Sequence, residues 1–243
     1  MATFRWGFVL LFFVSVLSFV QSSESRYAPG IVSILDSHAY ISKNKALIYW
    51  KISPYYISQQ NDRACSLATA TMIVNAARSS QILTANQLLA TQNGLLSAVQ
   101  DENWTKDVGI NGTGETLDRL KSLLFKALEA YGLSDFTVEA IHLKNSEEES
   151  LALLRSALIE GEVTGKLFVV VNFDRKFFTD PMGGGHFAPV GSYDQQTKRV
   201  LIMDPDRESY EPYWVPEKLF MEGMATEDGN HKECRGYLLI KIK

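Results

Sequence analysis

Hydrophobic and polar positions divide the chain into a helix-rich N-terminal half and a β-rich C-terminal half. Residues 65–77 are small and apolar throughout, which is typical of a buried helix. Residues 116–131 carry leucines three and four positions apart, so they predict an amphipathic helix. A third helix is predicted to begin at a capping box of Ser146 and Glu149 and to end at Gly161.

From residue 166 onward, short apolar runs separated by turn residues replace the helical pattern. The predicted strands there are 167–173, 187–193, 200–203 and 236–242, and an earlier strand is predicted at 137–143. Consecutive strands joined by short turns cannot run parallel, so the late strands are expected to form an antiparallel sheet. The predicted fold class is therefore α+β, with a helix-rich N-terminal half packed on a C-terminal antiparallel β-sheet.

The first 22 residues are interpreted as a secretory signal peptide. Arg5 precedes an apolar run at 8–20, and a polar stretch follows at 21–25. A helix over that apolar run would span only about 20 Å of a roughly 30 Å hydrocarbon core, so we expect cleavage rather than a stable membrane anchor. The protein is then exported to the periplasm or secreted, or lumenal in a eukaryote, with one domain at 26–243.

Charge and composition exclude some partners. The chain has 24 Lys and Arg against 28 Asp and Glu, so no positive excess is available to neutralise a phosphate backbone, and we expect no nucleic acid partner. Two cysteines and four histidines show no paired ligand spacing, which predicts no metal site and no cofactor. The sequence does not fix the oligomeric state, and a homodimer stays open.

Three segments carry residues suited to nucleophilic catalysis. Cys65 follows a polar loop at the start of the apolar helix, where backbone N–H groups and the helix dipole lower a thiol pKa. His186 follows three glycines and opens a strand, which allows close backbone approach beside a rigidly held imidazole. Asp204 ends the next strand, 18 residues later, so it is expected within reach of His186.

Alternative interpretations of these residues remain open at this point. Asp204 or Asp206 could simply cap the turn at Pro205, and a buried cysteine is often only a small hydrophobic residue. Export also permits a disulfide between Cys65 and Cys234, which would make the chain a non-catalytic secreted binding module. Against this, Gln59 lies six residues before the cysteine and could donate a side-chain N–H to an oxyanion.

The order Gln, Cys, Gly-His, Asp resembles that of the papain superfamily. The local sequences around these residues resemble the catalytic domain of phytochelatin synthases. The matching segments are QQNDRAC, ATATMIVNA, VVVNFDRK, GGGHFAPVGSYD, VLIMDPDRESYEPYWVP and CRGYLLI. The resemblance covers nearly the whole chain after the signal peptide and implies a papain-like fold. One departure is Ser66, where the family usually has glycine after the nucleophile.

The resemblance implies a role for each matched residue. Cys65 would be the nucleophile, His186 the general base and acid, Asp204 its orienting partner, and Gln59 the oxyanion donor. The residues implied around a bound γ-glutamyl group are Asn172, Gly185, Asp228 and Arg235. An aspartate and an arginine suit such a group because it carries an α-amine and an α-carboxylate.

The implied activity is that of a glutathione γ-glutamylcysteinyltransferase acting through a Cys thioester. Glycine would leave glutathione, and either water or a second glutathione would take the acyl group; without the cysteine-rich C-terminal region of plant members, hydrolysis is expected to exceed transfer. Cadmium or zinc would act as the metal–glutathione thiolate substrate. A papain-like peptidase of the bacteriocin-leader type, acting on another peptide, is the alternative enzyme.

Overall fold

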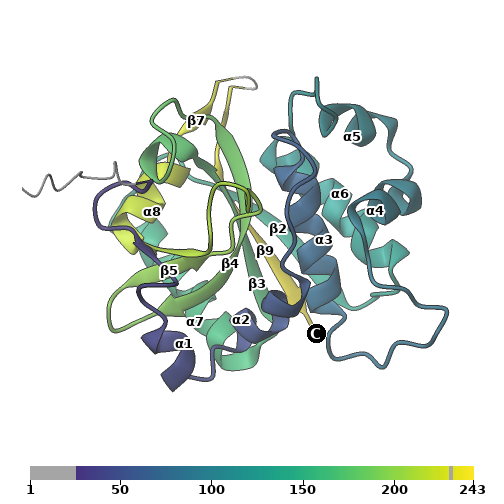
Figure 1. The fold of residues 1–243 in the computed structure, drawn as a ribbon, viewed down its shortest axis with the longest axis horizontal. Coiled ribbons are helices and arrows are strands. Elements are labelled where there is room, and N and C mark those ends of the chain that lie inside the picture. Colours follow the sequence, from purple (N-terminus) through teal and green to yellow (C-terminus); the bar gives the residue numbers. More distant parts are fainter. Residues whose placement is uncertain (1–25, 230–231) are drawn as a thin grey trace, which may run out of the picture.

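The computed structural model describes residues 26–229 and 232–243, in which helices cover both faces of an antiparallel sheet (Figure 1). The predicted signal peptide, residues 1–22, lies outside the described residues. Seven strands pair in the order β1-β6-β5-β4-β3-β9-β2, and all of these pairs are antiparallel. The strands are β1 (Val32–Ser33), β2 (Phe136–His142), β3 (Leu167–Asp174), β4 (Gly185–Asp194), β5 (Arg199–Ile202), β6 (Tyr213–Pro216) and β9 (Gly236–Ile242).

One helical layer covers the face of the sheet on which the candidate site lies. It comprises α3 (Cys65–Ala77), α4 (Gln92–Val99) and α6 (Leu117–Ala130), whose buried side chains share a core with β3, β4 and β9. The other face is covered by α7 (Glu148–Thr164) and α8 (Glu217–Met224). The shorter elements are α1 (Ala39–Lys43), α2 (Leu47–Ile52), α5 (Glu102–Asp107), and a hairpin of β7 (Glu227–Asp228) and β8 (Glu233–Cys234).

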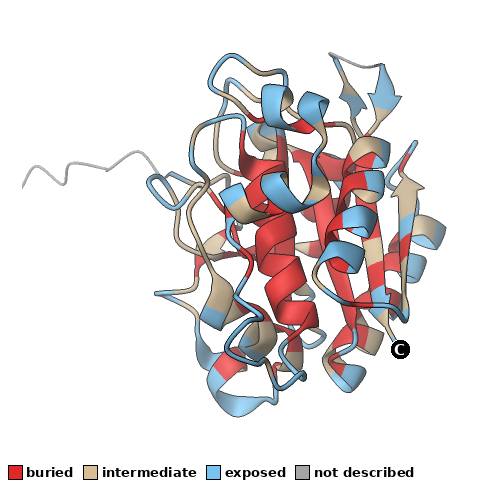
Figure 2. Ribbon diagram, turned by 90° about the vertical axis from the view of Figure 1, so that its right-hand side faces the viewer, coloured by how far each residue is buried: buried red, intermediate tan, exposed pale blue. Residues whose placement is uncertain are grey.

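Helix α3 lies at the centre of the molecule. All of its residues are buried, as Figure 2 shows along its whole length. Its many small side chains allow the backbone to approach the sheet closely, and the Thr69 hydroxyl donates a hydrogen bond to the Phe187 carbonyl of β4 at 3.1 Å. This contact fixes the start of the helix relative to the strand that carries His186.

Several predicted elements are confirmed, and one is corrected. The helix at 65–77 and the strand at 236–242 have the predicted bounds. Thr116 is the N-cap residue of α6, and its side chain accepts a hydrogen bond from the backbone N–H of Arg119. The capping box at Ser146 and Glu149 is wrong, because α7 begins after Glu147 without a side-chain cap.

The predicted end of this third helix is also wrong. Helix α7 continues through Gly161 to Thr164, and Gly165 ends it in the left-handed conformation. Gly161 instead serves packing, because a Cβ there would lie 2.6 Å from the Leu167 carbonyl oxygen.

The division into an early helical half and a late sheet half is only partly right. The α+β class holds, but α7 and α8 belong to the second helical layer and β2 precedes both of them in the chain. Strand β6 was not predicted, because prolines at 212 and 216 flank its short apolar run and weaken the strand pattern. In the two described stretches, the helices are all too short or too polar to cross a membrane.

Candidate active site

A cavity of about 350 Å³ lies at the N-terminal end of α3. One wall comes from the sheet side, with β3, the glycine loop before β4, and β7; the other comes from the loops that precede α3 and α6. Figure 1 places β7 and α5 on opposite sides of α3. The cavity is lined by Asp62, Arg63, Cys65, Thr113, Gly114, Glu115, Asn172, Arg175, Gly183, Gly184, Gly185, Phe187 and Asp228.

Cys65 is the first residue of α3 and forms part of the cavity lining. Its thiol shares a hydrogen bond with the imidazole of His186 and accepts one from the backbone N–H of Phe187. The Nε2 atom of His186 lies 2.7 Å from Asp204 Oδ1, which leaves Nδ1 to face the thiol. The structure thus brings together three residues that are widely separated in the sequence.

Asp204 is held by more than the histidine. Its Oδ1 also accepts the backbone N–H of Asp206 at 2.9 Å, and its Oδ2 accepts the hydroxyl of Tyr213 at 2.7 Å. The hydroxyl of Tyr56 donates to the Asp204 carbonyl at 2.6 Å. These contacts fix a buried carboxylate in one orientation, and they assign the position beside His186 to Asp204 rather than Asp206.

The charges of this group favour a thiolate and an imidazolium. Burial raises the pKa of the Cys65 thiol, but the hydrogen bond and charge of His186 outweigh burial and bring the pKa below its usual value. Burial lowers the pKa of His186, whereas the Asp204 carboxylate raises it more strongly, to about 10. Burial likewise raises the pKa of Asp204, and the His186 charge brings it below its usual value. The buried set is therefore arranged for an ionised thiol at neutral pH.

Glycines shape the approach to His186. Gly183 and Gly184 have φ values of 76° and 118°, which side chains other than glycine adopt only with strain. Gly185 lies against the guanidinium of Arg235, since a Cβ at this glycine would be 3.0 Å from Arg235 Nη1. The three glycines therefore allow the loop to turn and a buried arginine to approach it.

The residues implied for substrate binding gather on the sheet side of the cavity. Arg235 is 5% exposed, and its Nη1 lies 3.2 Å from Asp228 Oδ2. The backbone of Arg235 is fixed on both sides, by the Thr226 carbonyl and by the N–H of Leu143. Asn172 is buried near the C-terminal end of β3, and its Oδ1 has no hydrogen-bond partner among the described residues. Asn172, Gly185 and Asp228 line the cavity directly.

Gln59 lies outside the lining of the cavity, unlike Cys65. Its backbone N–H donates to the Pro205 carbonyl at 2.8 Å, which ties its loop to the turn after Asp204. Its Oε1 is buried without a hydrogen-bond partner in the part of the chain that the structure describes, and Gln59 does not line the cavity.

The alternative of a disulfide is contradicted. Cys65 and Cys234 are both free thiols. Cys234 belongs to the small hairpin, where it pairs with Glu227. Because Cys65 is hydrogen-bonded to His186, the interpretation as a disulfide-linked binding module is wrong for this structure.

Sequence reasoning missed the residues that brace the aspartate. Tyr213 lies within the segment YEPYWVP at residues 210–216. The sequence of this segment does not show which of Tyr210, Tyr213 and Trp214 contacts Asp204. Tyr56 precedes the cysteine loop by several residues and meets Asp204 only in the fold. Burial and the neighbouring Asp204 carboxylate raise the pKa of Tyr213 well above its usual value, so this hydroxyl stays protonated and donates.

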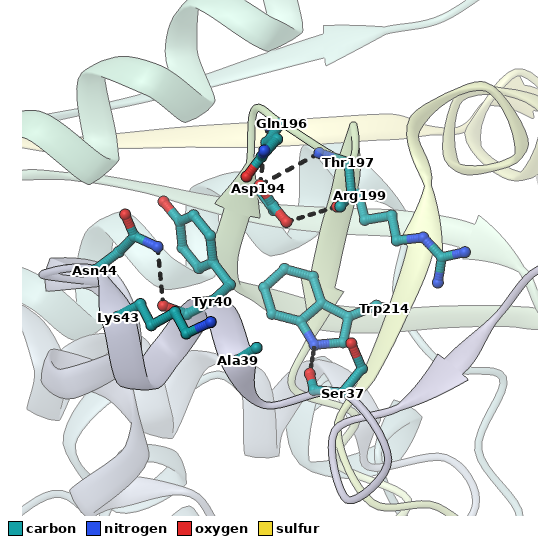
Figure 3. Close-up of a pocket in the computed structure, with 10 residues that line it drawn as sticks. All are labelled: Ser37, Ala39, Tyr40, Lys43, Asn44, Asp194, Gln196, Thr197, Arg199 and Trp214. Carbon is teal, nitrogen blue, oxygen red and sulfur yellow. Dashed lines mark hydrogen bonds between the residues drawn. The ribbon is translucent and has the colours of Figure 1, made fainter.

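A larger cavity, of about 580 Å³, lies between α1, the β4–β5 turn and β6 (Figure 3). Its polar groups largely pair with one another: Trp214 donates to the Ser37 carbonyl, Asn44 to the Tyr40 carbonyl, and Gln196 and Thr197 to Asp194. Its described lining contains no cysteine or histidine. The cavity beside Cys65 is therefore the candidate active site.

Within residues 26–229 and 232–243, no three His, Cys, Asp or Glu side chains gather in an arrangement that could hold a metal ion.

Comparison with known proteins gives relatives that match between 24% and 80% of this chain. The chain is 26% identical over 201 residues to glutathione gamma-glutamylcysteinyltransferase 3 of Lotus japonicus, covering 80% of this chain and 38% of that protein. It is 37% identical over 73 residues to the glutathione gamma-glutamylcysteinyltransferase of Schizosaccharomyces pombe, covering 30% and 17%. It is 43% identical over 58 residues to glutathione gamma-glutamylcysteinyltransferase 1 of Arabidopsis thaliana, covering 24% and 12%. The chain thus spans well under half the length of these relatives.

A family model described as phytochelatin synthase matches residues 35–237. The matched range contains Cys65, His186 and Asp204 together with the helix and strands that position them. Because this match extends over most of the chain, the chain belongs to the phytochelatin synthase family.

Proposed function

We propose that this protein is a glutathione γ-glutamylcysteinyltransferase that works through a thioester on Cys65. The observation that carries the proposal is the buried Cys65, His186 and Asp204 set beside the cavity. A thiol at the start of a buried helix, facing a histidine and an aspartate from an antiparallel sheet, also supports a papain-like arrangement. The family membership and the names of the relatives supply the substrate, glutathione.

The first half-reaction is acylation of the cysteine. The Cys65 thiolate attacks the carbonyl carbon of the Cys–Gly amide, the C–N bond breaks, and His186 gives its proton to the departing glycine amine. Asp204 keeps the imidazole in place and stabilises its charged form before this transfer. In this proposal the Gln59 side chain donates to the oxyanion that forms at the carbonyl.

The γ-glutamyl end of the substrate would occupy the sheet side of the cavity. Asp228 would accept the α-ammonium, and Arg235, which already pairs with Asp228, would bind the α-carboxylate. Asn172 contributes a buried amide oxygen without a partner in the described ranges, and Gly185 keeps the space open. This arrangement selects a zwitterionic amino-acid end over an ordinary peptide, which favours glutathione over a bacteriocin-leader peptide.

The second half-reaction decides the product. If water attacks the thioester, the product is γ-glutamylcysteine; if the amine of a second glutathione attacks, the product is a phytochelatin. Cadmium or zinc enters this scheme as the metal–glutathione thiolate that serves as substrate. Export after cleavage of the first 22 residues would place the reaction in the periplasm, outside the cell or in a lumen.

The test is incubation of the purified protein with glutathione, with and without cadmium. Released glycine is measured by amino-acid analysis and the products by mass spectrometry. We expect glycine release from the wild type and none from Cys65→Ala. Wild-type protein that has a free Cys65 thiol but releases no glycine would reject the proposed activity.

A further inference from the structure

The cavity wall that faces away from the sheet carries a buried carboxyl group that the mechanism above does not use. Glu115 is 7% exposed and lines the cavity that Cys65 also lines. Its Oε1 has no hydrogen-bond partner among the described residues. A buried acceptor without a partner destabilises a fold, so this one calls for a ligand.

The neighbouring cation is already committed to another carboxylate. Arg119 Nη2 lies 2.6 Å from Asp101 Oδ1, whereas its Nε is 3.7 Å from Glu115 Oε2. Lys126, on the same helix, also lies against Asp101, at 3.7 Å. Glu115 thus shares its counter-ion, Arg119, with Asp101, and its Oε1 keeps no hydrogen-bond partner among the described residues.

Burial and charge together set the protonation of Glu115. Burial raises its pKa most, Arg119 lowers it, and the nearby carboxylates Asp107 and Asp101 raise it further, to about 7. The other charged residues on the cavity lining are Asp62, Arg63, Arg175 and Asp228. Near neutral pH, Glu115 therefore exists in both forms and can take up and release a proton.

The two walls of the cavity offer separate binding regions for the two substrates of a transfer reaction. The sheet wall holds Asn172, Gly185 and Asp228, where the proposed function places the γ-glutamyl end of the acyl group. Thr113, Gly114 and Glu115 come from the loop before α6, a helix that packs against α3 in the helical layer. This second wall is left for the group that attacks the thioester.

We propose that Glu115 binds the α-ammonium of the second glutathione and takes the proton that converts it into a nucleophilic amine. This inference rests on the proposed function and deepens it. A carboxylate buried in a cavity suits an ammonium group, which offers three N–H donors and a full positive charge, and it repels an anion. Glu115 would then select an amine acceptor over water.

The proton balance of the transfer step is complete with the residues present. The ammonium gives one proton to the Glu115 carboxylate, which later releases it to solvent. The amine nitrogen attacks the thioester carbon, the C–S bond breaks, and Cys65 leaves as a thiolate. His186, neutral after acylation, takes the second proton from the nitrogen as the amide forms, and the thiolate–imidazolium pair is restored.

The test uses Glu115→Gln, which keeps the size of the side chain and removes its charge and basicity. Purified protein is incubated with glutathione, and γ-glutamylcysteine and the transfer product are quantified separately by mass spectrometry. We expect transfer to fall by roughly a hundredfold, the lower end of a general-base effect, while hydrolysis changes less than about twofold. Glu115→Asp should retain part of the transfer, because it keeps a carboxylate.

Two controls separate an acceptor role from a general effect of the substitution. Glu102→Gln makes the same substitution at an exposed position outside the cavity lining and should leave the transfer-to-hydrolysis ratio unchanged. Hydroxylamine, an acceptor that is largely unprotonated at neutral pH, should be acylated by Glu115→Gln at close to the wild-type rate. Thermal melting verifies that each variant is folded.

The outcomes distinguish this inference from the proposed function. If the wild type releases no glycine, the proposed function fails and the acceptor role falls with it. If the wild type releases glycine but forms no transfer product, or if Glu115→Gln reduces hydrolysis and transfer equally, the acceptor role alone is overturned.

Discussion

Asp204→Asn isolates the charge of the aspartate from its hydrogen bonds. Asp204 Oδ1 accepts from both His186 and the Asp206 N–H, so an asparagine oxygen in this position keeps both bonds. The asparagine N–H₂ group then meets the Tyr213 hydroxyl, which can turn and accept instead of donate. We therefore expect the fold to survive with only the negative charge lost.

The magnitude follows from what that charge does to His186. Burial by itself lowers the pKa of His186, and the Asp204 carboxylate is the largest contribution in the opposite direction. Without it, the imidazole is neutral at pH 7 and no longer stabilises the Cys65 thiolate. A hydrogen bond to a charged group contributes about 1.5–3 kcal/mol and a neutral one about 0.5–1.5 kcal/mol, so the loss of charge costs about 1–1.5 kcal/mol and glycine release from glutathione should fall roughly five- to tenfold at pH 7. The deficit should shrink as pH rises, because the thiol then ionises without help.

The assay is alkylation of Cys65 by iodoacetamide between pH 5 and pH 10, followed by mass spectrometry of the peptide that contains Cys65. Only the thiolate reacts, so wild-type protein should react at low pH and the variant only as the pH approaches about 8.5. Asp206→Asn is the matched control, since that side chain does not contact His186. An unchanged profile in Asp204→Asn, or a shifted profile in Asp206→Asn, would refute the reasoning.

Three further predictions test the nucleophile, the substrate pocket and the packing. Cys65→Ser should abolish glycine release with an unchanged melting temperature, and activity within tenfold of wild type would contradict its role. Arg235→Ala should slow glutathione roughly ten- to a hundredfold but leave acylation by a simple activated thioester unchanged, with Arg235→Lys between them; equal loss on both substrates would make Arg235 structural. Gly161→Ala forces a Cβ to 2.6 Å from the Leu167 carbonyl and should cost about 1–3 kcal/mol, a loss of several degrees in melting temperature, whereas Ser156→Ala on the exposed face should change it little.

The sequence by itself determined the elements whose signals are local. Residues 65–77 form a helix because their small apolar side chains suit complete burial, and residues 236–242 form a strand because of their apolar run after a turn. It also singled out Cys65, His186 and Asp204, because each stands in a local setting that suits its chemistry: a helix start, a glycine loop and a strand end.

Tertiary structure decided whatever depends on residues far apart in the chain. Tyr56 meets Asp204 across 148 positions, and no local pattern encodes that distance. Gly161 looked like a helix stop, but the close approach of a neighbouring strand gave it a packing role. Glu115 has no distinguishing sequence signal, since a glutamate before a helix is normally solvated. Glu115 becomes buried only when the fold brings the loop before α6 to the cavity that Cys65 also lines, and this burial is what makes it a candidate acceptor residue.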